Sequence, residues 1–345
     1  MGSFASAFGG LLDIKHALAQ PRLVEFVTVA GLILATAGSV TYVGLAGFNP
    51  DDPGIHDNRE YAALYEGHGA DVKKPFHWRV VIPALARMLP GGFEVSFGIV
   101  NILALTVAGV GLYYLLRHWR ASQNLSLIGV ALYFLSHTVL RFGGIPLVES
   151  AAQAILILAM LAAEKRQRFA FATLVILGMF VKETTSIVLL YPLLMSKPLR
   201  DRLTLSALAL PGIAAYAIVR LVIDPVNFGF EYSATAWITN IGSLIMPVGL
   251  GSWPGIVLSF GFLWVFVALG IRRGGLVPRR YALFIAACFA APIILTTDYE
   301  RVIFLSFPVA LALALPSMER ALSLSRRSGR RAALGAEIPQ SSLTS

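Results

Sequence analysis

Ten apolar segments follow one another along this chain, and they restrict its fold more than any other feature. They cover residues 23–47, 94–116, 124–141, 146–163, 168–181, 184–196, 203–223, 254–271, 280–297 and 301–317. A membrane-spanning helix needs about 20 apolar residues, with a range of roughly 17–25, and most of the segments fit. The chain is only 14% charged, whereas a soluble domain carries roughly 25% charged residues. We therefore predict an all-α polytopic membrane protein with about 10 (8–11) transmembrane helices.

The apolar run from 168 to 196 is too long for one spanning helix and short for two. Both ends are basic, with Lys165 and Arg166 before the run and Lys197 after it. Because Lys and Arg collect in cytoplasmic loops, both ends are predicted to be cytoplasmic. The run is then a hairpin of two short helices that turns at residues 182–185.

The charge distribution supports one orientation in the membrane. With ten segments and both termini inside, the inner loops and tails hold 19 of the 28 basic residues and 6 of the 19 acids. The inner side therefore carries a net charge of +13 and the outer side −4. This asymmetry follows the positive-inside rule. It also accounts for the overall charge of +9 without nucleic acid as a partner.

The organisation that follows is simple. Residues 1–22 form a cytoplasmic N-terminal segment, and residues 23–318 form a single transmembrane domain with large outer loops at 48–79 and 224–253. The tail, residues 319–345, is basic and then polar. We expect this tail to be disordered in the cytoplasm and to contact anionic membrane lipid.

The loop 48–79 is the first long polar segment in the chain. Its acids include Asp51, Asp52, Asp57 and Glu60, which are candidates for general base chemistry beside the membrane. A divalent cation is the cofactor that would suit Asp51, Asp52, His56 and Asp57, since hard cations prefer carboxylate oxygens. Their spacing matches no specific metal loop, however, and a merely solvated loop is the alternative.

Other polar clusters interrupt the apolar segments at their predicted outer ends. They are Arg141 with Glu149, Lys182 with Glu183, Arg220 with Asp224, and the run Asp298-Tyr299-Glu300-Arg301. Ionisable groups near membrane depth usually mark pathways or sites, although charged side chains at helix ends also act as interfacial anchors. Lys182 and Glu183 are the better candidates for a site, because they lie at the tip of the predicted hairpin.

The segment 79–90, RVVIPALARMLP, ends the first outer loop. It places Arg79, Pro83 and Arg87 four residues apart, which predicts one polar stripe on an amphipathic helix in the plane of the interface. The alternative is that the segment begins the second span.

One span is followed by a large outer loop with Asp57 and Tyr61 in a D-x-x-x-Y setting. Pro75, Phe76 and Arg79 then stand in a P-F-x-x-R setting. Further along come the segments Lys182-Glu183-Thr184 and Asp298-Tyr299-Glu300-Arg301. In this order, the elements resemble the C-type glycosyltransferase superfamily, and the last two segments are similar to features of its bacterial members. The chain departs from the family in being short and in having no soluble C-terminal domain.

The resemblance implies an enzyme of the bacterial inner membrane, working on its periplasmic side. Its donor would be a polyprenyl-phosphate-linked sugar, and its acceptor a glycan, a lipid or a protein. Asp57 would be the catalytic base, with Asp51, Asp52 and Glu60 behind it. The lipid phosphate would be bound among Arg79, Arg141, Lys182, Glu183, Asp298 and Arg301, because basic side chains stabilise a departing phosphate.

Two other classes remain open. A transporter or flippase for a lipid-linked or anionic substrate predicts broken helices and an internal repeat, and we find no convincing repeat between the halves. A non-catalytic membrane assembly partner predicts that every outer carboxylate tolerates a neutral replacement.

Overall fold

The computed structural model describes residues 21–49, 57–69, 72, 76–195, 199–223, 242, 253–272, 276–295 and 299–336. Every regular element within these ranges is a helix, so the prediction of an all-α protein is confirmed for the described chain. The candidate residues Asp51, Asp52, His56 and Asp298 lie outside the described residues, as does nearly all of the loop 224–253.

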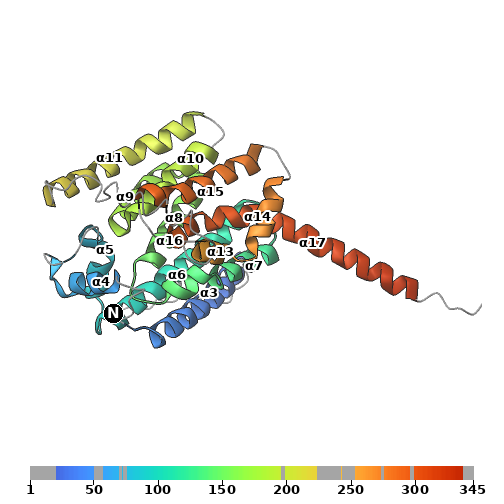
Figure 1. Ribbon diagram of the computed structural model, residues 1–345, viewed down its shortest axis with the longest axis horizontal. Helices are drawn as coiled ribbons and strands as arrows, with labels where there is room; N and C mark the ends of the chain where they lie inside the picture. The colour runs from blue at the N-terminus through green and yellow to red at the C-terminus, as the bar shows by residue number, and fades with distance from the viewer. Residues whose placement is uncertain are drawn as a thin grey trace, which may run out of the picture.

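The first half of the chain contains two long helices and several short ones. The elements are α3 (Pro21–Ala46), α4 (Asp57–Glu66), η2 (Phe76–Trp78), α5 (Val81–Arg87), α6 (Phe93–His118), α7 (Gln123–Phe134), the π-helical turn η3 (Val139–Gly143) and α8 (Glu149–Glu164). α6 packs against both α3 and α8, and α7 lies beside α6 (Figure 1). α6 is therefore the centre of this half.

The second half begins with the predicted hairpin. Its elements are α9 (Arg168–Val181), η4 (Glu183–Leu189), α10 (Leu190–Met195), α11 (Leu199–Ile223), α13 (Trp253–Phe260), α14 (Leu263–Arg272), α15 (Leu276–Leu295), α16 (Tyr299–Ile303), η5 (Phe304–Ser306) and α17 (Phe307–Ala336). α9 packs between α8 and α11, and α14 packs along α17. The last part of α17 projects well beyond the other helices (Figure 1).

The hairpin is confirmed. α9 ends at Val181 and the chain resumes as η4 at Glu183. Tyr191 of α10 then donates a hydrogen bond to Glu164, which lies four residues before α9 begins. The chain has therefore returned to the end of the bundle from which α9 started.

The described residues contain fewer candidate spanning helices than the ten that the sequence predicts. Among the described residues, four helices are long and apolar enough to cross a membrane, within Leu23–Ala46, Phe93–His118, Arg200–Val219 and Tyr299–Ala321. A fifth span results if α13 and α14, which meet at 77°, are counted as one. Some of the other apolar segments form shorter helices, and polar breaks such as Ser136–His137 and Lys182–Glu183 interrupt two of them.

Two of the candidate spans, α3 and α11, have apolar and open surfaces. Only 17% of the most apolar stretch of α3 and 22% of that of α11 is buried within the protein. Leu32, Val43, Leu210 and Val222 are among their exposed side chains. Such continuous apolar faces on long helices are compatible with contact with lipid.

Two predicted segments differ from the structure. The interfacial helix was expected to present Arg79, Pro83 and Arg87 on one stripe, but α5 begins only at Val81, and both Arg79 and Pro83 are buried. Arg79 turns inward because an acidic partner is available there, as described below. The tail was expected to be disordered from 319, yet the backbone of α17 stays helical to Ala336.

Candidate functional site: an ion-pair network

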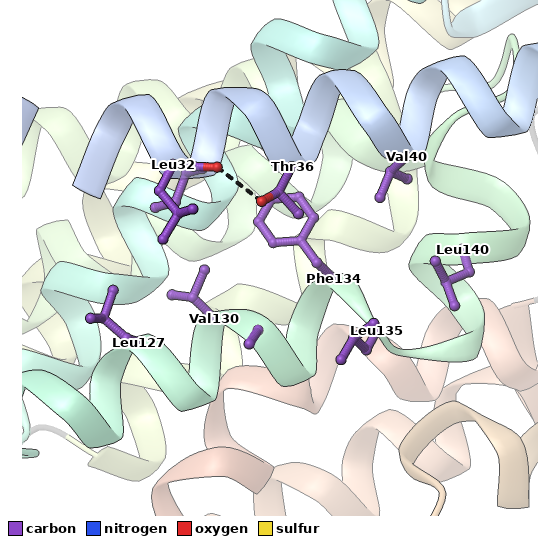
Figure 2. A pocket seen from close by; sticks show the side chains of 10 residues that line it. Leu32, Thr36, Val40, Leu127, Val130, Phe134, Leu135 and Leu140 are labelled. Carbon is purple, nitrogen blue, oxygen red and sulfur yellow. Dashed lines mark hydrogen bonds between the residues drawn. The ribbon is translucent and has the colours of Figure 1, made fainter. Parts of the chain in front are cut away.

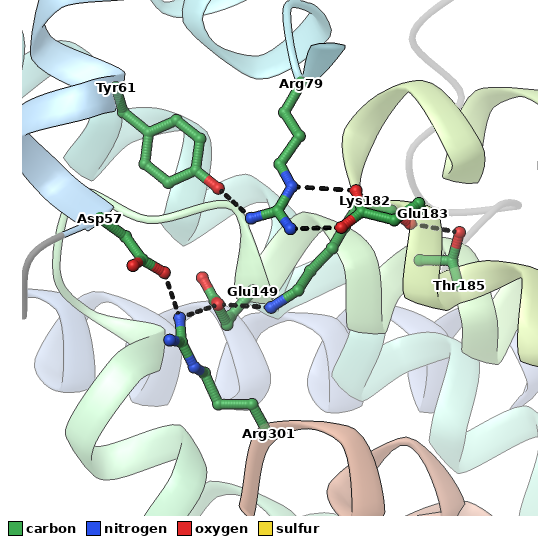
Figure 3. Close-up of polar contacts among 8 residues, drawn as sticks. All are labelled: Asp57, Tyr61, Arg79, Glu149, Lys182, Glu183, Thr185 and Arg301. Carbon is green, nitrogen blue, oxygen red and sulfur yellow. Dashed lines mark hydrogen bonds and ion pairs between the residues drawn. The ribbon is translucent and has the colours of Figure 1, made fainter. Parts of the chain in front are cut away.

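Arg301 of α16 joins two acids that are far apart in the chain. Its Nη1 atom donates to Asp57 Oδ2 at 2.5 Å and to Glu149 Oε1 at 2.7 Å. Lys182 Nζ donates to the same Glu149 oxygen at 2.8 Å. α4, α8, the hairpin turn and α16 therefore meet at one point (Figure 3).

A second pair lies beside the first. Arg79 donates through Nε and Nη2 to the two carboxylate oxygens of Glu183, at 3.0 and 2.5 Å, and through Nη1 to the hydroxyl of Tyr61 at 3.0 Å. Because Glu183 directly follows Lys182, the two pairs are continuous (Figure 3). We call this set the ion-pair network; it consists of Asp57, Tyr61, Arg79, Glu149, Lys182, Glu183 and Arg301.

The hairpin turn presents neighbouring side chains to different partners. Lys182 has an extended backbone (φ −160°, ψ 120°), which ends α9. Its carbonyl accepts from both the backbone N–H and the hydroxyl of Thr185, at 2.9 Å each. This local turn sends the Lys182 side chain toward Glu149 and leaves Glu183 facing Arg79.

Glu149 is held by the short segment that precedes α8. Ser150 donates its hydroxyl hydrogen to the carbonyl of Gly143 at 2.8 Å. Asn101 of α6 donates to the carbonyl of Ile145 at 2.6 Å. These bonds fix the segment 143–149 against α6, so the first residue of α8 has a defined position.

An apolar cluster packs beside the network and includes its member Tyr61. Tyr61 and Ile82 come from the first loop region, and they pack with Phe97, Phe142 and Val181 of the helical bundle. The Tyr61 and Phe76 rings meet edge to face with centroids 5.6 Å apart. The first loop region is therefore held on the bundle by packing as well as by charge.

The charges in the network balance. Asp57, Glu149 and Glu183 supply three negative charges, and three basic side chains supply three positive ones. The exposed fraction of the side chains ranges from 7% for Arg79 to 23% for Glu183. Buried charges are tolerated when they are paired and hydrogen-bonded, and each charge in this network has such a partner.

The pKa values outside the apolar segments follow these contacts. Burial raises the pKa of the Tyr61 phenol above its usual value, and the Arg79 guanidinium only partly offsets this, so Tyr61 remains a neutral hydroxyl. Burial acts to lower the pKa of Arg79, but the Glu183 carboxylate and Tyr61 hold it well above the usual value. Arg79 is therefore a permanent cation.

A second, more exposed group lies next to the network. Arg141 Nη1 is 3.6 Å from Glu300 Oε1, and His137 Nδ1 is 3.8 Å from Glu300 Oε2. Arg141 is more exposed than the cations of the network, with 45% of its side chain accessible to solvent. The Arg141 and Arg301 guanidinium groups both lie over the Phe142 ring, at 5.1 and 5.3 Å from its centroid.

Most of the candidate site residues that the structure describes lie close together. Asp57, Arg79, Lys182, Glu183 and Arg301 belong to the network. Arg141 lies beside it and contacts Glu300 instead, and Glu60 lies one turn beyond Asp57 on α4, half-buried.

Sequence reasoning placed Glu149 in a polar cluster with Arg141, but it did not select Glu149 as a site residue. The structure shows that Glu149 contacts two cations of the network. His137 was not selected either, and its ring approaches Glu300. No pattern in the local sequence indicates which of these groups meet across the fold.

The metal site stays a prediction. No cluster of three or more His, Cys, Asp or Glu side chains with the geometry to bind a metal is found in the described part of the chain. Three of the four proposed ligands, Asp51, Asp52 and His56, lie outside that part.

Comparisons with known proteins gave no relative: no family model, no curated protein and no solved structure matches this chain.

Proposed function

We propose that this protein is a membrane glycosyltransferase that moves a sugar from a polyprenyl-phosphate-linked donor to an acceptor hydroxyl on the outer face of the membrane. The observation that carries the proposal is the contact of Asp57 with Arg301 and, through Glu149, with Lys182. This contact joins an acid of the first loop to one cation at the hairpin tip and another in the last apolar segment.

The reaction needs two kinds of group. The acceptor oxygen forms a bond to the anomeric carbon while the bond from that carbon to the phosphate oxygen breaks. Asp57 would take the acceptor proton as general base, and it keeps 15% of its side chain exposed. The leaving phosphate would be stabilised by fixed positive charge, for which the half-exposed Arg141 is more accessible than the three cations of the network.

The test is sugar transfer by membranes that contain Asp57→Asn protein. Glu66→Gln is the matched control, since it also removes one carboxylate from α4, but an exposed one. We expect transfer from a panel of polyprenyl-phosphate sugars to be lost in Asp57→Asn and kept in Glu66→Gln, with equal membrane insertion. Full transfer by Asp57→Asn would exclude the assigned role.

A transporter for a lipid-linked substrate is the second candidate, because one specific observation favours it. α13 and α14 meet at 77° across a break at residues 261–262, and broken helices are a feature of transporter binding sites. Purified protein in liposomes distinguishes the two candidates. A transporter moves a labelled lipid-linked sugar between leaflets without chemical change, whereas the proposed enzyme consumes it when an acceptor is present.

A further inference from the structure

A small cavity lies beside the ion-pair network. Its volume is about 20 Å³, and Glu149 and Arg301 form part of its wall. Tyr133 of α7, Thr138 and Gln153 of α8 also line it. Polar side chains therefore form part of a wall that also contains Leu105, Val139 and Phe304.

Four buried oxygen atoms of the lining residues have no hydrogen-bond partner in the described part of the chain. They are Tyr133 Oη, Thr138 Oγ1, Glu149 Oε2 and Gln153 Oε1. Buried polar groups in folded proteins are almost always hydrogen-bonded, to protein or to ordered water. Four such atoms around one cavity point to a bound polar ligand.

The types of the four groups identify the ligand. The Tyr133 and Thr138 hydroxyls can each donate a hydrogen bond, and the oxygens of Glu149 and Gln153 accept. Glu149 and Gln153 are four residues apart on α8, so they share one face of that helix. A water molecule donates two hydrogen bonds and accepts two. We propose that this cavity binds one ordered water molecule, which donates to Glu149 and Gln153 and accepts from Tyr133 and Thr138.

Charge and size exclude the other small ligands. Lys182 and Arg301 already contact Glu149 Oε1 at 2.8 and 2.7 Å, so a metal cation would add a third positive charge beside one carboxylate. The same carboxylate repels an anion. A volume of about 20 Å³ is close to the roughly 10–15 Å³ that a single water needs.

The water has a structural consequence for the network. Oε1 of Glu149 is held by two cations, and the water holds Oε2. Both oxygens of the carboxylate are then fixed, and with them the positions of Lys182 and Arg301. Thr138 and Gln153 are therefore positioning residues, and this inference holds whichever reaction the protein performs.

The direct test is a structure of the full chain in lipid nanodiscs at a resolution that shows water. We expect one density peak within hydrogen-bonding distance, about 2.6–3.2 Å, of the four oxygens, in sodium chloride and equally in choline chloride. A cavity without density, or a peak that disappears without sodium, would overturn the proposal.

A matched pair of variants gives a second test. Thr138→Val removes one hydroxyl that faces the cavity at nearly constant volume. Thr106→Val is the control, because the Thr106 hydroxyl donates to Ile102 of its own helix at 2.7 Å. We expect Thr138→Val to lose the peak and to unfold at a lower temperature than Thr106→Val. Retention of the peak in Thr138→Val with an equal unfolding temperature would contradict the assigned donor.

Discussion

Arg301 Nη1 lies 2.5 Å from Asp57 Oδ2, although 244 positions separate the two residues in the chain. The contact joins the first helix of the first loop to the beginning of the last apolar segment. The same guanidinium donates to Glu149, so one side chain ties three helices. This arrangement makes Arg301 the residue on which the network most depends.

Replacing Arg301 with Met should therefore destabilise the protein strongly. Asp57 would lose its described partner, and Glu149 would keep only Lys182. Removing one member of a buried ion pair costs about 3–5 kcal/mol, because the remaining charge is left uncompensated. The measurement is the free energy of unfolding in detergent, compared with Arg166→Met.

Arg166 is a suitable comparison because it also pairs with an acid, Asp201, at 3.5 Å, but 70% of its side chain is exposed. Exposed pairs contribute at most about 1 kcal/mol. Similar losses in the two variants would show that the network contributes no more than a surface pair.

The pair between Arg79 and Glu183 should make stability depend on pH. Burial acts to raise the pKa of Glu183, but the Arg79 guanidinium outweighs it and holds that pKa below its usual value. A lowered pKa in the folded state means that the stabilisation is fully present above the ordinary pKa of Glu, about 4.3, and is lost as the pH falls through the folded value.

The unfolding temperature of Glu183→Gln should accordingly be lower than that of the unchanged protein at pH 7, and the difference should shrink toward pH 3. Glu66→Gln is the control, because its side chain is exposed on α4, and its curve should run parallel to that of the unchanged protein. A constant difference for Glu183→Gln would contradict the assigned ion pair.

Two glycines of α3 should respond oppositely to Ala. A Cβ atom on Gly44 would lie 2.8 Å from the Cα of Gly144, whereas a Cβ on Gly38 would meet nothing within 4 Å. Ala improves helix propensity by about 1 kcal/mol at both sites, but overpacking at Gly44 costs about 1–3 kcal/mol. We expect Gly38→Ala to raise the unfolding temperature and Gly44→Ala to lower it. Equal increases would show that α3 does not approach Gly144 this closely.

Much of the helical architecture could be predicted from the sequence, because apolar runs and charged ends depend on local residues. The hairpin at residues 182–185 is the clearest example, since basic residues at both ends require the chain to turn. The smaller number of candidate spans among the described residues has a related reason. An apolar run shows that a segment is buried in protein or lipid, but not that it is one continuous helix. Gly261, with φ 52°, lies in such a break between α13 and α14.

The site was only partly predictable. Charged residues at helix ends were visible, and Asp57, Lys182 and Arg301 were selected from them. The partners were not visible, because Glu149 meets Arg301 across 152 positions of the chain. The direction in which Arg79 points depends equally on the tertiary position of Glu183. A periodic pattern alone therefore placed Arg79 on a surface stripe, although the side chain is buried.

The orientation of the protein can be tested with single cysteines. The only native cysteine, Cys288, is fully buried, so the unchanged protein should not react with a membrane-impermeant maleimide. Glu66→Cys lies on α4, in the loop predicted to be outside, and Glu319→Cys lies on the part of α17 predicted to be inside; both positions are exposed.

The reagent is added to cells whose outer membrane has been removed and whose inner membrane is intact. We expect Glu66→Cys to be labelled in these cells, and Glu319→Cys to be labelled only after the inner membrane is permeabilised. The positive charge assigned to the inner side requires this result. The reverse labelling pattern would place the ion-pair network on the cytoplasmic side, and a polyprenyl-linked donor presented outside could then not reach Asp57.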